Sequence, residues 1–328
     1  MRLVNLVMGL PAKGIVWATL VLLLGVRPVW GAVAPDALGL YLSKNGYGGA
    51  QLVHVGNFYH LPIQSSGKPG NLLIDTGSPD TMIFRSSVKR LRLVESKSKQ
   101  HVSGAFGRGH DVYGVTTIRS LTAGNCTLTN VLVAVAQGDT YDSFHRANSN
   151  GLLGLHELVK FGAILDLGNN LLYFRPSRPA EGIASEIKTI LSRQGFKQVP
   201  LSLKNSHVCA PGALNGVPCS FIIDTGGYVT SLDLDFVKRA KLKSTPTRLI
   251  AEGLGGSSSV DLVRFTSLRI GDYELGNGSA AVVRLNPEIV QSNSSVAGFI
   301  GGEYLGMNYA IFDFVTGTMY LRPAVLPR

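Results

Sequence analysis

The chain has 328 residues, a formal charge of +10 and 45% hydrophobic residues, which is enough for two domains with cores of their own. Its 7 histidines are scattered without metal-ligand spacing, and the chain has no phosphate-binding glycine loop. Composition and motifs therefore argue against a metal site or nucleotide cofactor, and we expect no cofactor. Runs of Val, Ile and Thr punctuated by Gly and Asn favour a β-rich fold.

Residues 1–31 are typical of an export signal. Arg2 and Lys13 come before an apolar stretch of 12 residues, Ile15 to Val26, and small residues follow at Gly31 and Ala32. This stretch is too short to span a membrane comfortably. We expect export to a periplasmic, cell-surface or secreted location, with an uncleaved signal anchor as the alternative. No later segment is a candidate membrane span.

A first candidate site follows the apolar run Leu72 to Ile74, where the chain reads Asp75-Thr76-Gly77-Ser78. A carboxylate at the tip of a buried strand is costly unless something requires it there. Gly77 permits a tight turn, Thr76 can hydrogen-bond the backbone of another segment, and Ser78 can hydrogen-bond the carboxylate. Downstream, the apolar segment ending at Gly154 can pass beneath this turn.

A helix is predicted between Pro179 and Gly195, because apolar residues recur there at i, i+4, i+7 and i+8. We expect it to link or brace two lobes. The predicted organisation is a signal peptide at 1–31, a first lobe at 32–178, a helical linker at 179–197 and a second lobe at 198–328.

The second half repeats the plan of the first. Asp224-Thr225-Gly226 follows another apolar run, 149 residues after the first motif, and Gly301 ends the matching downstream segment. The ranges 151–176 and 298–323 align without gaps at an offset of 147, with 9 identities in 26 positions. Such self-similarity indicates duplicated lobes. Two carboxylates in related halves are expected to meet at a shared interface, where they keep one proton between them.

These motifs resemble the pepsin and retropepsin superfamily of aspartic proteases, as tandem retropepsin-like lobes in one chain. The resemblance lies in the pattern apolar-apolar-Asp-Thr-Gly followed by apolar-apolar-Gly in each half, and it covers nearly all of residues 51–323. It implies an all-β fold of two pseudo-twofold-related β-barrel lobes. It also implies that Asp75 and Asp224 activate a water molecule to hydrolyse a peptide bond, without a covalent intermediate. Gly227 departs from the family pattern, which usually has Thr, Ser or Ala there.

The resemblance further implies a flap over the substrate. The first half has two more residues than the second between Gly104 and Ser120, and family members place an aromatic followed by glycine in this loop. Phe106-Gly107 and Tyr113-Gly114 both fit. The expected partner is a polypeptide substrate rather than nucleic acid. Since two lobes in one chain complete the site, a monomer is expected.

Several alternatives stay open. The carboxylates could merely stabilise turns, which is the preferred interpretation for the duplicated Asp166 and Asp313. A catalytically inactive peptide-binding or inhibitor protein could share this fold, and a non-peptide substrate is a further possibility. The basic run Lys89 to Lys99 is interpreted as a solvated face. Cys209 and Cys219 could form a disulfide across a hairpin, although the turn signal does not place them opposite each other.

Overall fold

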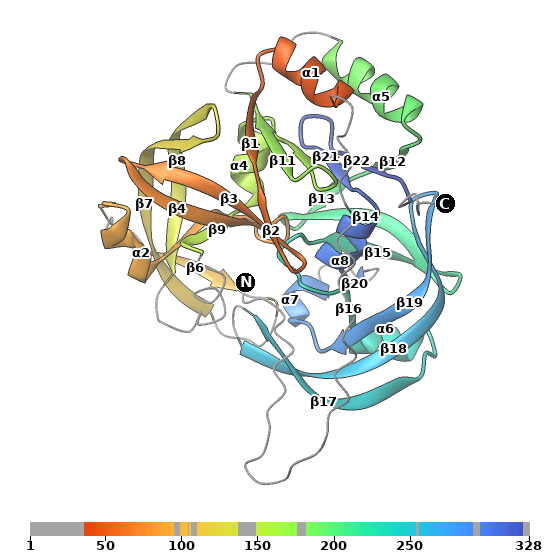
Figure 1. Cartoon of the computed structure of the whole chain (residues 1–328). Coiled ribbons are helices and arrows are strands. Elements are labelled where there is room, and N and C mark those ends of the chain that lie inside the picture. The colour runs from red at the N-terminus through yellow and green to blue at the C-terminus, as the bar shows by residue number, and fades with distance from the viewer. Residues whose placement is uncertain are drawn as a thin grey trace, which may run out of the picture.

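The computed structural model describes residues 36–94, 99–103, 105, 110–136, 149–175, 182–253, 256–290 and 296–323. Strands dominate these residues and form three sheets, two of eight strands and one of six (Figure 1). The predicted all-β architecture with two related barrel lobes and a linking helix is confirmed. Residues 1–31, the expected signal, lie outside the described residues, and the expected domain boundaries stay predictions.

The first lobe is built on one eight-stranded sheet. An additional antiparallel pairing of β3 with β7 joins two parts of this sheet that are not neighbours in the strand order. In spatial order its strands are β2 (Val53–Val55), β3 (Phe58–Ser65), β4 (Lys68–Ile74), β9 (Gly151–Leu153), β5 (Met82–Phe84), β8 (Cys126–Ala136), β7 (His110–Ala123) and β6 (Lys99–Ser103).

The second lobe repeats this order strand for strand, including the closing pair, here β14 with β18. Its strands are β13 (Ser202–Lys204), β14 (His207–Leu214), β15 (Val217–Ile223), β20 (Val296–Ile300), β16 (Ser231–Asp233), β19 (Tyr273–Val283), β18 (Gly256–Ile270) and β17 (Ser244–Gly253). The internal repeat of the sequence is thus a repeat of topology.

A six-stranded sheet joins the lobes, and its order is β1 (Gly48–Gln51), β11 (Leu171–Phe174), β10 (Ile164–Asp166), β21 (Ile311–Asp313), β22 (Thr318–Leu321) and β12 (Lys197–Pro200). At its centre, β10 and β21 pair antiparallel, with Leu165 opposite Phe312. Because these two residues are themselves equivalent in the repeat, the pseudo-twofold axis passes between them.

The described helices are short and lie around the sheets (Figure 1). They are α1 (Ala37–Lys44), α2 (Arg85–Arg90), α4 (Leu155–Lys160), α5 (Ile183–Arg193), α6 (Leu234–Arg239), α7 (Pro287–Val290) and α8 (Gly302–Met307). The predicted linking helix corresponds to α5, whose buried Ile183, Ile187 and Leu191 pack with α1 and with strands of both lobes in the joining sheet. Gly195, at φ +83°, ends it in a left-handed turn.

The three cysteines are buried free thiols. In the β14–β15 pair, Cys209 lies opposite Ile222 and Cys219 lies opposite Gly212, so the two cysteines are three positions out of register. Their side chains also belong to different apolar clusters on the two faces of the sheet. This separation explains why the disulfide considered from sequence is not formed. No helix among the described residues is long and apolar enough to cross a membrane.

Candidate active site

Each candidate carboxylate follows the end of a buried strand that has a parallel neighbour. Asp75 follows β4, which runs parallel to β9, and its N–H donates to the Leu153 carbonyl at 3.0 Å. Asp224 follows β15 beside β20, and its N–H donates to the Ile300 carbonyl, also at 3.0 Å. Apolar side chains occur on both faces of these strands because both faces are buried.

The glycines that end the downstream segments allow these chains to cross closely. A Cβ on Gly154 would lie 2.3 Å from the Asp80 carbonyl oxygen, and one on Gly301 would lie 2.5 Å from the Val229 carbonyl carbon. Real Cβ atoms do not approach backbone this closely. Each apolar-apolar-Gly segment therefore crosses close to its Asp turn, as predicted.

Thr76 and Thr225 lock the two turns together across the lobe boundary. The Thr76 hydroxyl donates to the Ile223 carbonyl at 2.8 Å and accepts from the Thr225 N–H at 3.0 Å. The Thr225 hydroxyl mirrors this, donating to the Ile74 carbonyl at 2.9 Å and accepting from the Thr76 N–H at 3.1 Å. All four hydrogen bonds are buried, so they fix the relative position of the two carboxylates.

The carboxyl groups of Asp75 and Asp224 meet at this interface. A Cβ on Gly77 would lie 2.4 Å from Asp224 Oδ1, and a Cβ on Gly226 would lie 2.3 Å from the Asp75 carboxyl carbon. Each carboxylate thus occupies the space over the glycine of the opposite turn. The charge of each group disfavours ionisation of the other, so a proton on one of them stabilises the pair.

Burial raises the pKa of both carboxyl groups, since neither has exposed surface. The pKa of Asp224 is raised well above its usual value, by burial first and then by the neighbouring Asp75 charge. Asp75 Oδ1 accepts the N–H groups of Gly77 and Ser78, both at 3.0 Å, which favours its charged form. Asp224 Oδ1 accepts only the Gly226 N–H, at 2.9 Å. Asp224 is therefore the group whose protonated form the surroundings favour more strongly.

Ser78 supports the first carboxylate differently from the expectation. Its backbone N–H bonds Asp75, whereas its hydroxyl donates to the Asp80 carbonyl at 2.9 Å. The side chain is thus engaged in closing the turn instead of contacting the carboxylate. At Gly227, the N–H donates to the Asp224 carbonyl at 3.2 Å and does not reach the carboxylate.

Sequence reasoning missed a second pair of threonines that supports the crossings. The hydroxyls of Thr81 and Thr230 each accept the N–H of a crossing glycine, Gly154 and Gly301 respectively, at 3.0 Å. The Thr81 hydroxyl in turn donates to the buried Glu157 at 2.7 Å. The signal was present, because the two threonines are 149 residues apart, as the aspartates are.

His207 was also missed, and it contacts the first turn from the second lobe. Its Nδ1 lies 3.2 Å from the Gly77 carbonyl, and burial lowers its pKa. The residue equivalent to His207 in the first lobe is Phe58, whose ring packs against that of Tyr228 at 4.9 Å between centroids. The surroundings of the two aspartate turns are therefore chemically different.

The structure describes only part of the segment in which the flap is expected. Phe106 and Gly107 lie outside the described residues, and the backbone of Tyr113 pairs with Gln100 in the β6–β7 hairpin. The carbonyl of the buried Ala105 accepts the Asn286 N–H at 2.9 Å, so the tip region of this hairpin reaches the second lobe. The second lobe has a corresponding hairpin of β17 and β18.

Asp166 and Asp313 are placed away from the pair, in the joining sheet. Asp166 accepts hydrogen bonds from the backbone and side chain of Asn169, and Asp313 accepts the N–H groups of Val315 and Thr316. Both therefore stabilise turns. Among the described residues, no group of three or more His, Cys, Asp or Glu side chains could hold a metal ion.

The fold and the facing carboxyl groups define a two-lobed protein of the acid-protease type. The chain belongs to the aspartyl protease family, whose family model matches it twice, at residues 61–156 and 210–304. No curated protein matches its sequence significantly. Among solved structures it is similar to the aspartic proteinase from Irpex lacteus, with 16% identity and a TM-score of 0.51, covering 85% of this chain and 98% of the other.

Proposed function

We propose that the protein is an aspartic endopeptidase that hydrolyses peptide bonds with a water molecule activated between Asp75 and Asp224. The observation that carries this proposal is the meeting of two buried carboxyl groups, and we propose that they share one proton. Hydrolysis of an unactivated amide requires a base that activates water and an acid that protonates the carbonyl oxygen. Such a pair supplies both.

In the proposed mechanism, ionised Asp75 accepts a proton from water while the water oxygen attacks the scissile carbonyl carbon. Asp224 donates its proton to the carbonyl oxygen, which gives a tetrahedral gem-diol without a covalent bond to the enzyme. Collapse of this intermediate returns a proton to Asp224, and the proton on Asp75 passes to the leaving nitrogen. The two carboxyl groups thus regain their initial state.

The surrounding residues position these groups. Thr76 and Thr225 hold the turns in register, while the N–H groups of Gly77, Ser78 and Gly226 orient the carboxylates. The β6–β7 hairpin is proposed to act as the flap, with Phe106 or Tyr113 over the substrate. We further propose a polypeptide substrate, a monomeric enzyme and export directed by residues 1–31.

The test is incubation of the purified chain with an unfolded protein between about pH 3 and pH 7, with and without a statine-type inhibitor. We expect cleavage that the inhibitor blocks. Asp75→Asn and Asp224→Asn should each lower kcat at least about 1,000-fold, since each removes one partner of acid–base catalysis. Binding of peptide by the wild-type chain without any cleavage would instead establish the inactive binding protein.

A further inference from the structure

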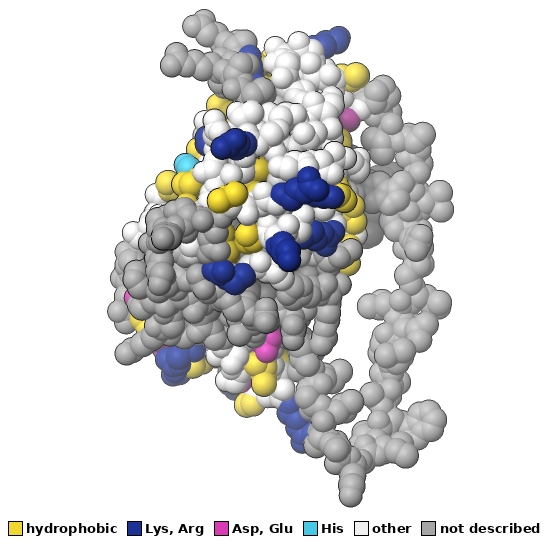
Figure 2. Space-filling view, turned by 90° about the vertical axis from the view of Figure 1, so that its left-hand side faces the viewer, with side chains coloured by type: hydrophobic (Ala, Val, Ile, Leu, Met, Phe, Trp, Pro, Cys, Tyr) yellow, Lys and Arg dark blue, Asp and Glu magenta, His cyan; other side chains and the backbone are white. Residues whose placement is uncertain are grey.

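The outer side of the first lobe carries a cluster of cations. Figure 2 shows Lys and Arg side chains gathered on the face of the molecule that is the left-hand side of Figure 1. We call this cluster the basic face. It has five members, which lie on α2, on the segment after α2, beside the β3–β4 turn and on β7. Its members are Lys68, Lys89, Arg90, Arg92 and Arg119, all exposed except the half-buried Lys68.

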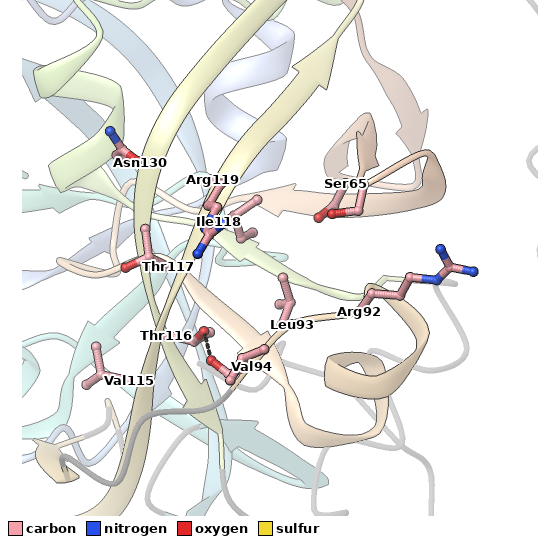
Figure 3. Close-up of a pocket in the computed structure, with 11 residues that line it drawn as sticks. Ser65, Arg92, Leu93, Val94, Val115, Thr116, Thr117, Ile118, Arg119 and Asn130 are labelled. Atoms are coloured by element: carbon pink, nitrogen blue, oxygen red, sulfur yellow. Dashed lines mark hydrogen bonds between the residues drawn. The ribbon is translucent and has the colours of Figure 1, made fainter.

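Two members of the basic face line a groove of about 770 Å³. Arg92 and Arg119 line it from opposite sides, together with Ser65 on the β3–β4 hairpin and Asn130 on β8 (Figure 3). Arg90 borders the other side of the same hairpin. The Lys160 ammonium group donates to the Asn130 carbonyl at 3.0 Å, which adds a further cation beside the groove.

The cations of the basic face have no counter-charges within the described part of the chain. None of the five forms an ion pair with a described carboxylate. In this lobe the acidic side chains that the structure describes are the buried Asp75, Glu157 and Asp166, together with Asp80 in the turn after Asp75 and Asp36, which caps α1. Among the described side chains the face is therefore positively charged, and an anionic partner would neutralise it.

The second lobe repeats this arrangement only in part. Lys238, Arg239 and Lys241 occupy the positions of Lys89, Arg90 and Arg92, whereas Val217 and Thr266 replace Lys68 and Arg119. Lys238 on α6 also pairs with Asp235 at 3.9 Å. There the Asn215 side chain accepts the Thr266 and Ser267 N–H groups. In the first lobe the fully buried Ser65, at the position of Leu214, lies at the groove, and its hydroxyl has no hydrogen-bond partner.

An apolar side chain beside the cations indicates the kind of partner. Val94 is 85% exposed and follows Arg92 by two residues, next to the groove (Figure 3). An exposed apolar residue near the cations that line the groove suits the boundary of an anionic bilayer, which accepts apolar groups below its charged headgroups. A nucleic acid would leave Val94 without a favourable contact.

The position of the basic face leaves the candidate active site accessible. Figure 1 shows α2 and β7 on the side of the first lobe away from the second lobe, whereas Asp75 and Asp224 meet between the lobes. We propose that the basic face docks the protein on an anionic lipid surface, with a headgroup phosphate in the groove. This docking is independent of the proposed catalysis.

The test is co-sedimentation of the full chain with phosphatidylcholine vesicles that contain or lack phosphatidylglycerol. The vesicles without phosphatidylglycerol provide the baseline for binding through the apolar residues 15–26. We expect additional binding to the anionic vesicles that weakens as salt is raised, because exposed charges are screened. Each cation near such a surface strengthens binding about fivefold.

A matched pair of variants separates the basic face from net charge. The double variant Arg92→Glu/Arg119→Glu should weaken binding to the anionic vesicles at least about 30-fold. Lys241→Glu/Lys243→Glu changes the charge equally on the second lobe, where both lysines are exposed, and should leave most of the binding. Urea unfolding checks that both variants are folded.

Three outcomes would overturn the proposal. They are equal weakening by both double variants, equal binding to vesicles with and without phosphatidylglycerol, and binding of DNA in place of lipid.

Discussion

Removing the Thr76 hydroxyl should lower the free energy of unfolding, because this hydroxyl joins the two lobes. Thr76→Val keeps the shape of the side chain but leaves the Ile223 carbonyl and the Thr225 N–H without their partners in a fully buried site. Each unsatisfied buried group costs about 1 to 3 kcal/mol, so the loss should be about 2 to 6 kcal/mol. That is a large share of the roughly 5 to 15 kcal/mol by which domains are stable.

Thr76→Ser is the matched control, because it keeps the hydroxyl and removes only one methyl group, which costs about 1 kcal/mol. The assay is urea unfolding followed by circular dichroism, since both tryptophans of the chain lie within residues 1–31. Thr225→Val should behave like Thr76→Val, because the two threonines make mirrored hydrogen bonds. If Thr76→Val and Thr76→Ser lose the same stability, the hydroxyl network does not join the lobes.

Gly77→Ala should abolish cleavage in the peptidase assay, because its Cβ would lie 2.4 Å from Asp224 Oδ1; retained activity would refute the facing geometry. Burial lowers the pKa of His207, so its neutral form contributes stability above about pH 6.5 that is lost as pH falls through the lower folded pKa. His207→Phe should therefore make the unfolding free energy fall less steeply with acidification, and an unchanged slope would contradict this role. Thiol reagents should label none of the three buried cysteines before unfolding and all three afterwards, as read by mass spectrometry; a mass lower by two hydrogens would reveal a disulfide.

The repeat allowed much of the fold to be predicted. The offset of 149 residues matches β3 and β4 to β14 and β15, and the offset of 147 matches β9 to β20. The positions of Asp75 and Asp224 followed from one strong local signal, an acidic residue after a buried apolar run. The helix between the lobes was visible because its apolar stripe has a helical period.

Other features depend on contacts that a single sequence does not reveal. The joining sheet pairs β10 with β21, strands far apart in the chain and only three residues long. The hydroxyl of Ser78 could have reached either the carboxylate or the Asp80 carbonyl, and the turn geometry selects the carbonyl. Likewise, the contact of His207, at the start of β14, with the Gly77 carbonyl joins two lobes, and no local sequence pattern encodes it.

The most direct test of the central claim is a titration of the aspartate carboxyl groups by ¹³C NMR in the wild-type chain. Asp75→Asn and Asp224→Asn identify the two resonances. We predict that one carboxyl of the pair, preferably Asp224, stays protonated well above the ordinary aspartate pKa of about 4, while its partner is already ionised. Ionisation of both groups together near pH 4 would contradict the shared proton and the mechanism built on it.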